Sequence, residues 1–139
     1  MRKEIEKLLQ SVQKPARYAG GELNSVMKDK SKVALRYAFC FPDTYEIGMS
    51  HLGMKILYGV ANAREDTWCE RVFAPADDME ALMRANGEPL FALESGDPIK
   101  DFDMIGFTMQ YELSYTNILN MLDLAVVPLR AGDRKSLTP

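Results

Sequence analysis

Strand-like and helix-like segments alternate along the chain, and this alternation restricts the fold more than any other feature of the sequence. Apolar runs of strand length are each followed by a segment whose apolar residues recur at helical spacing. The predicted strands are 33–41, 67–73 and 103–109, and the predicted helices are 50–63, 76–86 and 112–124. This order favours right-handed β–α–β crossovers. We therefore predict an α/β fold with a mostly parallel sheet, a flavodoxin-like three-layer sandwich.

The first predicted strand has apolar residues on both of its faces, as expected for a strand that is covered on both sides. Arg36 interrupts this pattern near the start of the strand, where we expect water to reach it. In the helix that follows, Ser50 is the predicted N-cap. The residues of this helix that we expect to be buried are Leu52, Ile56, Leu57 and Val60.

The residues before the alternation form a separate predicted segment. Residues 2–12 have apolar side chains at helical spacing, and Pro15 ends this amphipathic helix. An extended lead-in follows, with a short strand predicted at 25–28. We therefore divide the chain into an N-terminal helix and extended lead-in, residues 1–32, and an α/β domain, residues 33–139.

The last residues of the chain are polar and loop-like. Residues 126–129 are interpreted as the beginning of a fourth strand, and no pattern typical of a closing helix or strand follows them. We therefore expect the α/β domain to be incomplete, truncated at its C-terminal end.

Composition excludes several classes of partner. The net charge is −3 and no basic cluster is present, so we do not expect a nucleic acid to bind. No apolar stretch approaches the roughly 18 residues that a membrane span needs, and the start does not resemble a signal peptide. Cys40 and Cys69 both lie in or beside apolar runs, which is typical of a reduced protein rather than a disulfide scaffold. We expect a cytoplasmic protein with neither a nucleic-acid nor a membrane partner.

Two loops are predicted to meet beyond the carboxyl ends of the strands, where ligands bind in parallel α/β sheets. Residues 41–51 join the first strand to its helix, and residues 108–112 follow the third strand. Both loops are rich in hydrogen-bonding groups, and both precede a helix N-terminus, which favours anions. The candidate binding residues are Asp43, Tyr45, Gly48, Ser50, His51, Thr108, Gln110 and Tyr111.

The first loop resembles the Asp-x-His-x-x-Gly motif of cobalamin-binding domains, whose histidine reaches the cobalt. The corresponding residues here run from Asp43 to Gly48, with Tyr45 in the place of the histidine. A phenol is a weaker partner for cobalt than an imidazole, so the resemblance implies a tyrosine packed beneath the corrin. The second loop, Thr108-Met109-Gln110, lies where the resembled domains have a Ser-x-Leu element that lines the channel for the nucleotide tail.

Longer runs resemble the start of a family of radical SAM proteins in which a cobalamin-binding-like, Rossmann-like domain precedes an iron–sulfur barrel. The runs are 14–22, 41–53, 69–75 and 110–117. The resemblance implies cobalamin as a cofactor of this domain, and S-adenosylmethionine (SAM) and a 4Fe-4S cluster in the full-length protein. It also implies the downstream radical SAM domain of the same chain as partner. Neither cysteine belongs to the Cys-x-x-x-Cys-x-x-Cys motif of such enzymes, so we do not expect this segment to be catalytic by itself.

Two hypotheses about function stay open at this point. In the first, the domain positions a corrin or a substrate against the downstream iron–sulfur and SAM barrel. In the second, it is a degenerate Rossmann-like domain without cobalamin that acts as a docking or dimerisation module. The partner in the case of dimerisation is a second copy of the chain. The tyrosine at position 45 and the loose match at 108–110 favour the second hypothesis.

Structural roles compete with binding roles for individual candidates. Gly48 also suits a tight turn between strand and helix, which a glycine backbone permits. His51, the single histidine, also suits a helix cap. Tyr111, Glu112 and Tyr115 either face the crevice or pack against the downstream domain.

Overall fold

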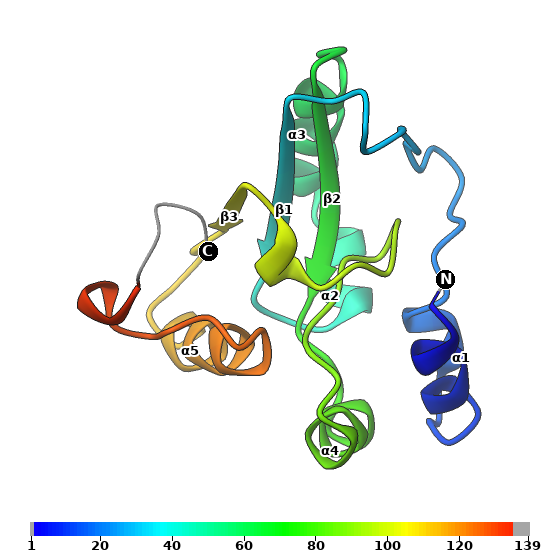
Figure 1. Ribbon diagram of the computed structural model, residues 1–139, viewed down its shortest axis with the longest axis vertical. Helices are drawn as coiled ribbons and strands as arrows, with labels where there is room; N and C mark the ends of the chain where they lie inside the picture. The colour runs from blue at the N-terminus through cyan, green and yellow to red at the C-terminus, as the bar shows by residue number, and fades with distance from the viewer. Residues whose placement is uncertain (1, 135–139) are drawn as a thin grey trace.

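The computed structural model describes residues 2–134, which form a parallel sheet with helices on both of its faces (Figure 1). The strands are β1 (Leu35–Phe41), β2 (Thr67–Phe73) and β3 (Met104–Phe107). Their order is β2-β1-β3, and β1 pairs in parallel with both neighbours. The predicted α/β class and the parallel sheet are confirmed.

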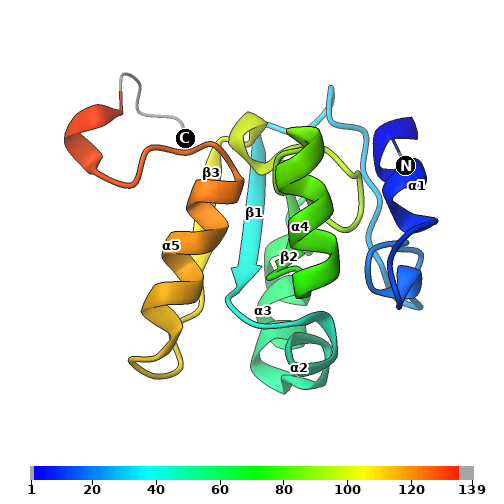
Figure 2. The same ribbon diagram turned by 90° about the horizontal axis from the view of Figure 1, so that it is seen from below.

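The helices occupy two layers, one on each face of the sheet (Figure 2). They are α1 (Lys3–Leu9), α2 (Tyr45–Ser50), α3 (Leu52–Asn62), α4 (Asp77–Asn86) and α5 (Ser114–Leu124), with short 3₁₀ turns at Pro15–Arg17, Ile99–Asp101 and Ala131–Asp133. Helices α4 and α5 cover one face, and α1 packs beside α4. Helix α3 covers the other face, so the predicted three-layer arrangement is confirmed.

Alternate residues of β1 supply the two cores, as the period of a strand requires. Ala38 and Cys40 face α4 and α5, where the packing partners include Met79, Met83, Met121 and Leu124. Phe39 and Phe41 face α3 and pack with Cys69, Phe73, Met54 and Tyr58. Both cysteines are buried free thiols, and burial raises the pKa of Cys69 to about 12.

The local signals of β2 and α4 are confirmed by the structure. Strand β2 begins and ends where the sequence predicts, and each of its residues is buried. Helix α4 begins after Ala76 and ends at Asn86. Gly87 follows with a φ of 65°, the left-handed conformation that stops a helix at glycine.

Arg36 remains partly accessible to water, as expected, but most of its side chain is buried. Its guanidinium lies over the ring of Phe102, 4.1 Å from the centroid, and pairs with Glu70 at 2.5 Å and with Asp97 at 3.0 Å. The side chain is only 12% exposed. A planar guanidinium tolerates such burial because it stacks on rings while its N–H groups point at carboxylates.

The predicted buried face of α3 is also wrong. Leu52, Ile56, Leu57 and Val60 are 55% to 69% exposed, and the helix buries Met54, Tyr58 and Asn62 instead. Apolar residues occur nearly all round this helix, so periodicity does not select a face. Hydrogen bonds of the polar residues select it. The Tyr58 hydroxyl accepts from Val26 N at 2.7 Å, and the Asn62 amide bonds to both backbone groups of Cys69.

The outer edge of β2 is closed by side chains and a loop rather than by another strand. Lys28 Nζ donates to the carbonyl of Thr67 at 2.6 Å, and Asn62 covers the next free backbone groups along the strand. Further along, Arg71 N donates to Glu94 Oε2 at 2.7 Å, and Leu93 N donates to Arg71 O at 2.8 Å. An exposed strand edge is a template for unwanted pairing, and these groups remove it.

Two of the predicted short strands do not form. Residues 25–28 make no ladder, because Val26 gives its backbone groups to the side chains of Tyr58 and Trp68. Residues 126–129 turn away after α5, since Val126 has a φ of 59° and its N–H bonds back to Asp123. Within the described residues 2–134, β3 pairs with β1 along one edge, and the other edge of β3 has no strand partner.

We expect Asn62→Ala to lower the free energy of unfolding by about 1–3 kcal/mol, because two buried backbone groups of Cys69 lose their partner. Asn86→Ala is the matched control, since Asn86 is also the last residue of a helix but is exposed. Urea denaturation of both variants measures the difference. Equal midpoints would show that Asn62 does not close the edge.

Candidate functional site

A cavity of about 370 Å³ lies beyond the carboxyl ends of β1 and β3, where the loops after these strands meet. Its lining includes four of the predicted site residues, namely Asp43, His51, Gln110 and Tyr111, together with Phe41, Pro42, Ile47 and Ser114. The volume is within the range of small-molecule sites. The structure therefore brings together the two loops that the topology predicts to be neighbours.

Asp43 shapes the first loop through its backbone and its carboxylate. Its N–H donates to Phe41 O at 2.9 Å, and Oδ1 accepts from Thr44 N at 2.7 Å. Its carbonyl accepts from Ala74 N, just after β2. The amide of Asn117 on α5 donates to Pro42 O at 2.9 Å and fixes the loop from the other side. Neighbouring segments thus hold the wall of the cavity.

His51 is both a helix cap and a wall of the cavity. Its Nδ1 accepts from Met54 N at 3.2 Å at the beginning of α3, and its ring packs on Phe41 with centroids 5.3 Å apart. Because Nδ1 is the acceptor, the neutral ring carries its hydrogen on Nε2. In this tautomer Nε2 can donate a hydrogen bond to a ligand. Ser50 is not the predicted N-cap, and its hydroxyl instead donates to Ile47 O at 2.7 Å.

The orientation of each residue in this loop follows from the helix α2 that it forms. Residues three or four apart share a face of a helix. Ile47 of α2 and His51, which follows the helix with an extended backbone, both line the cavity. Tyr45 and Gly48 share another face, directed at the ring of Phe73. The sequence predicts a loop here, with Tyr45 facing the crevice. Because the residues form a helix, Tyr45 faces Phe73 instead, and His51 lines the cavity.

Tyr45 lies outside the cavity, which differs from the expectation that it packs beneath a ligand there. Its ring meets Phe73 edge-on, with centroids 5.5 Å apart and planes at 77°. Burial, and next the carboxylate of Glu22, raise the pKa of its phenol.

Gly48 has a packing role. A Cβ at this position would lie 2.3 Å from Cε1 of Phe73, a contact that real structures do not contain. Thr108 continues the β3 pairing, because its N–H donates to Cys40 O at 3.0 Å. Its buried hydroxyl has no hydrogen-bond partner among residues 2–134.

The surroundings of the cavity are apolar and exposed. Side chains near its two loops include Ile47, Met109, Tyr111, Leu113 and Tyr115, each about half exposed or more. Exposed apolar patches of this kind mark surfaces that bind a ligand or another protein. The cavity thus combines a few polar groups with an apolar rim.

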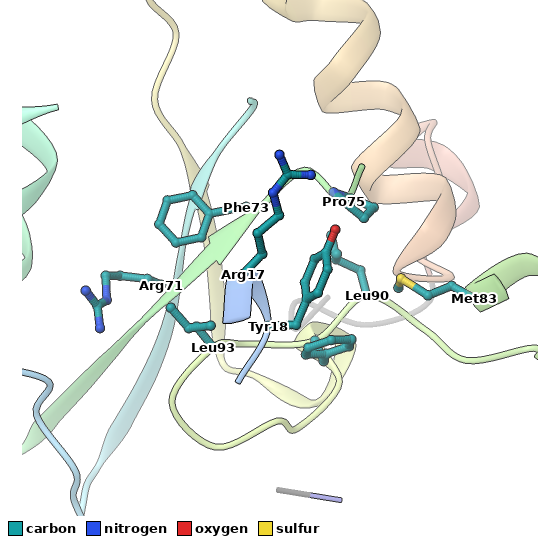
Figure 3. Close-up of a pocket in the computed structure, with 9 residues that line it drawn as sticks. Arg17, Tyr18, Arg71, Phe73, Pro75, Met83, Leu90 and Leu93 are labelled. Atoms are coloured by element: carbon teal, nitrogen blue, oxygen red, sulfur yellow. The ribbon is translucent and has the colours of Figure 1, made fainter. Parts of the chain in front are cut away.

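A second cavity is much smaller and lies between packed side chains. It measures about 20 Å³, enough for about one water molecule. Figure 3 shows Tyr18 beside Leu90 and Pro75 at its centre (Figure 3). The Tyr18 hydroxyl accepts from Ala76 N at 3.0 Å and anchors the N-terminal segment to the start of α4.

Sequence reasoning missed the ionic cluster around Arg71. Arg71 Nε donates to Glu94 Oε1 at 2.6 Å, and Nη2 donates to Glu22 Oε2 at 3.1 Å and Ser25 Oγ at 2.8 Å. Burial raises the pKa of Glu94, while the charge of Arg71 lowers it. The available signal was a pair of adjacent charges, Glu70 and Arg71, in an otherwise apolar strand.

Comparison with known proteins assigns the chain to a family. The family model described as "Radical SAM proteins, N-terminal" matches residues 53–139, more than half of the chain. The chain belongs to this family. No curated protein and no solved structure matches it.

The radical SAM N-terminal match covers one of the two walls of the candidate site. Gln110 and Tyr111 fall within residues 53–139, whereas Asp43 and His51 precede the matched segment. None of the helices within residues 2–134 has the length and apolar character needed to cross a membrane. The same residues contain no group of three His, Cys, Asp or Glu side chains placed to hold a metal ion.

We expect Gly48→Ala to destabilise the fold by about 1–3 kcal/mol, because the added methyl overlaps the ring of Phe73. Gly59→Ala is the matched control in α3, where a Cβ meets no atom within 4 Å. It should stabilise the protein by up to about 1 kcal/mol through helix propensity. Thermal unfolding of both variants checks the opposite signs, and a neutral Gly48→Ala would contradict the packing role.

We expect Glu94→Gln to cost about 3–5 kcal/mol of stability, because it leaves the buried guanidinium of Arg71 without its closest charge partner. Glu46→Gln removes an exposed partner of Arg17 and should have a much smaller effect. Urea midpoints of the two variants provide the comparison. A similar loss in both would show that burial does not strengthen the Arg71 pair.

Proposed function

We propose that this radical SAM N-terminal domain binds cobalamin in the cavity at the carboxyl ends of β1 and β3 and presents the corrin to the radical SAM domain of the full-length protein. The observation that carries the proposal is the position of His51. Its imidazole lines the cavity. Coordination of cobalt through Nε2 would place the ring hydrogen on Nδ1, so His51 would give up the hydrogen bond that Nδ1 accepts from Met54 N when the corrin binds. The proposed protein ligand is thus His51, six positions after the tyrosine that the motif resemblance aligns with the usual histidine.

The donor set of the cavity fits a corrin better than a free metal ion. A free ion needs several protein ligands, and residues 2–134 offer no such group. The cobalt of a corrin already has the nitrogens of its ring, so one imidazole suffices. When bound, cobalamin supplies a cobalt centre suited to group transfer.

The other lining residues suit the periphery of the corrin. Asp43 and Gln110 can accept hydrogen bonds from its side-chain amides, and Tyr111 offers a hydroxyl. Ile47 and the exposed residues around the cavity supply apolar contact for the ring. These residues hold and orient the ligand in the proposal, and none of them carries out a chemical step.

The cluster and SAM are proposed to bind in another domain of the full-length protein. A cluster needs accessible thiolates, and both Cys40 and Cys69 are fully buried. Burial raises the pKa of Cys40 well above its ordinary value and that of Cys69 to about 12. The thiols of the described residues therefore do not fit a 4Fe-4S site.

The outer face of α3 favours a second candidate function, a docking or dimerisation module without cobalamin. A helix that is apolar all round is normally covered on all sides. Here Leu52, Ile56, Leu57 and Val60 are left exposed. In this case the domain would contribute a contact surface rather than a cofactor site.

The cobalamin proposal is tested by mixing the 139-residue chain with hydroxocobalamin and removing unbound ligand by gel filtration. We expect an equimolar corrin absorption to remain with the protein. His51→Asn keeps a strong N-cap and removes the imidazole, so it should abolish nitrogen coupling from isotope-labelled histidine in the cobalt(II) electron paramagnetic resonance spectrum. Tyr45→Phe is the control and should leave the spectrum unchanged.

A colourless protein at saturating hydroxocobalamin would overturn the proposal. In that case sedimentation analysis of the same chain tests the docking alternative. Concentration-dependent association that Ile56→Glu removes, but Ala81→Glu on the exposed side of α4 does not, would support the module without cobalamin.

A further inference from the structure

A cavity of about 340 Å³ lies on the other side of α2 from the proposed cobalamin site. It is bounded by the lead-in before β1, by α3 and by Arg71 of β2. Helix α2 separates the two cavities, since Ile47 lines the first while Gly48 and Met49 line the second. Its volume is at the lower end of the range for small-molecule sites.

Arg71 gives this cavity a buried hydrogen-bond donor. Its side chain is 8% exposed, and Figure 3 shows the guanidinium directed away from the small cavity at Tyr18 (Figure 3). Two of its three nitrogens bond to oxygens, as described above. Among residues 2–134, the partner of the third, Nη1, is the sulfur of Met49 at 3.2 Å. A thioether is a weak acceptor, so an oxygen entering the cavity would be a better partner.

The charges around Arg71 favour an uncharged acceptor. Glu22 and Glu94 both pair with its guanidinium, so its positive charge is already matched. A third carboxylate would lie close to these two and would have to give up its hydration. Lys55 also lines the cavity, but its side chain is exposed and water screens its charge.

The walls of the cavity suit an apolar body. Val26, Met54 and the ring of Tyr58 line it, and methionine side chains adapt to ligands of different shape. The space beside Gly59 is open, because a Cβ there would meet no atom within 4 Å. A larger side chain at position 59 would therefore extend into the cavity, and its Cβ would not clash with neighbouring atoms.

We propose that this cavity is a second ligand site, for an uncharged, mainly apolar molecule whose carbonyl or amide oxygen accepts a hydrogen bond from Arg71 Nη1. The apolar body lies against Val26, Met54 and Tyr58. The ligand oxygen replaces the sulfur of Met49 as the partner of Nη1. This site is independent of cobalamin and stands whether or not the first cavity binds a corrin.

The test uses 2-naphthamide as the probe and its isostere 2-naphthoate as the charged comparison. Isotope-labelled methionine methyl groups report binding by nuclear magnetic resonance. We expect 2-naphthamide to shift the methyl signals of Met49 and Met54 and to leave that of Met109, beside the other loop, in place. We expect 2-naphthoate to bind more weakly.

Variants at position 59 locate the binding. Gly59→Leu fills the cavity and should weaken 2-naphthamide binding by about tenfold or more. Ala81→Leu adds similar bulk to the exposed side of α4 and should change nothing. Unchanged signals from the remaining methionines show that each variant is folded. Tighter binding of 2-naphthoate, equal binding to Gly59→Leu, or absent shifts at Met49 and Met54 would each overturn the proposal.

Discussion

The guanidinium of Arg71 is the group on which the arrangement of segments around β2 depends. It joins β2 to the loop at Glu94, to the lead-in at Glu22 and Ser25, and to α3 through the ring of Tyr58, 4.7 Å from its centroid. These contacts allow β2 to be an edge strand and still be buried. The lead-in has no ladder of its own, so its path across α3 follows from this charge and from the bonds of Val26 and Lys28.

The elements with strong local signals could be predicted from the sequence, and the choice of face could not. Strand β2 is a run of β-type residues between turn residues, and α4 has acidic residues at its start and a glycine after its end, so their bounds follow from local chemistry. Helix α3 has two apolar faces. Its buried face is chosen by Asn62 and Tyr58, whose partners Cys69 and Val26 lie on other segments, and spacing carries no information about such partners.

The place of the candidate site was predictable from topology, whereas the side chains that line it were not. Parallel strands bring their following loops to one edge of the sheet, so Asp43 and Gln110 meet in one cavity. Whether Tyr45 or His51 faces that cavity depends on residues 45–50 forming a helix. If the same motif is interpreted as an extended loop, Tyr45 is expected to face the cavity. The cluster at Arg71 was missed because a charged residue in a strand is typical of an exposed face.

The position of β1 in the centre of the sheet has a consequence for synthesis of the chain. Leu35–Phe41 leaves the ribosome before either of the strands that pair with it, and Glu94, which closes the edge of β2, appears later than both β1 and β2. A strand with aromatic residues is then without its partners for as long as translation of the intervening segments takes, at about 5–20 residues per second. The nascent chain is thus most exposed to aggregation before β2 has emerged, and early docking of α3 on Phe39 and Phe41 would shorten that interval.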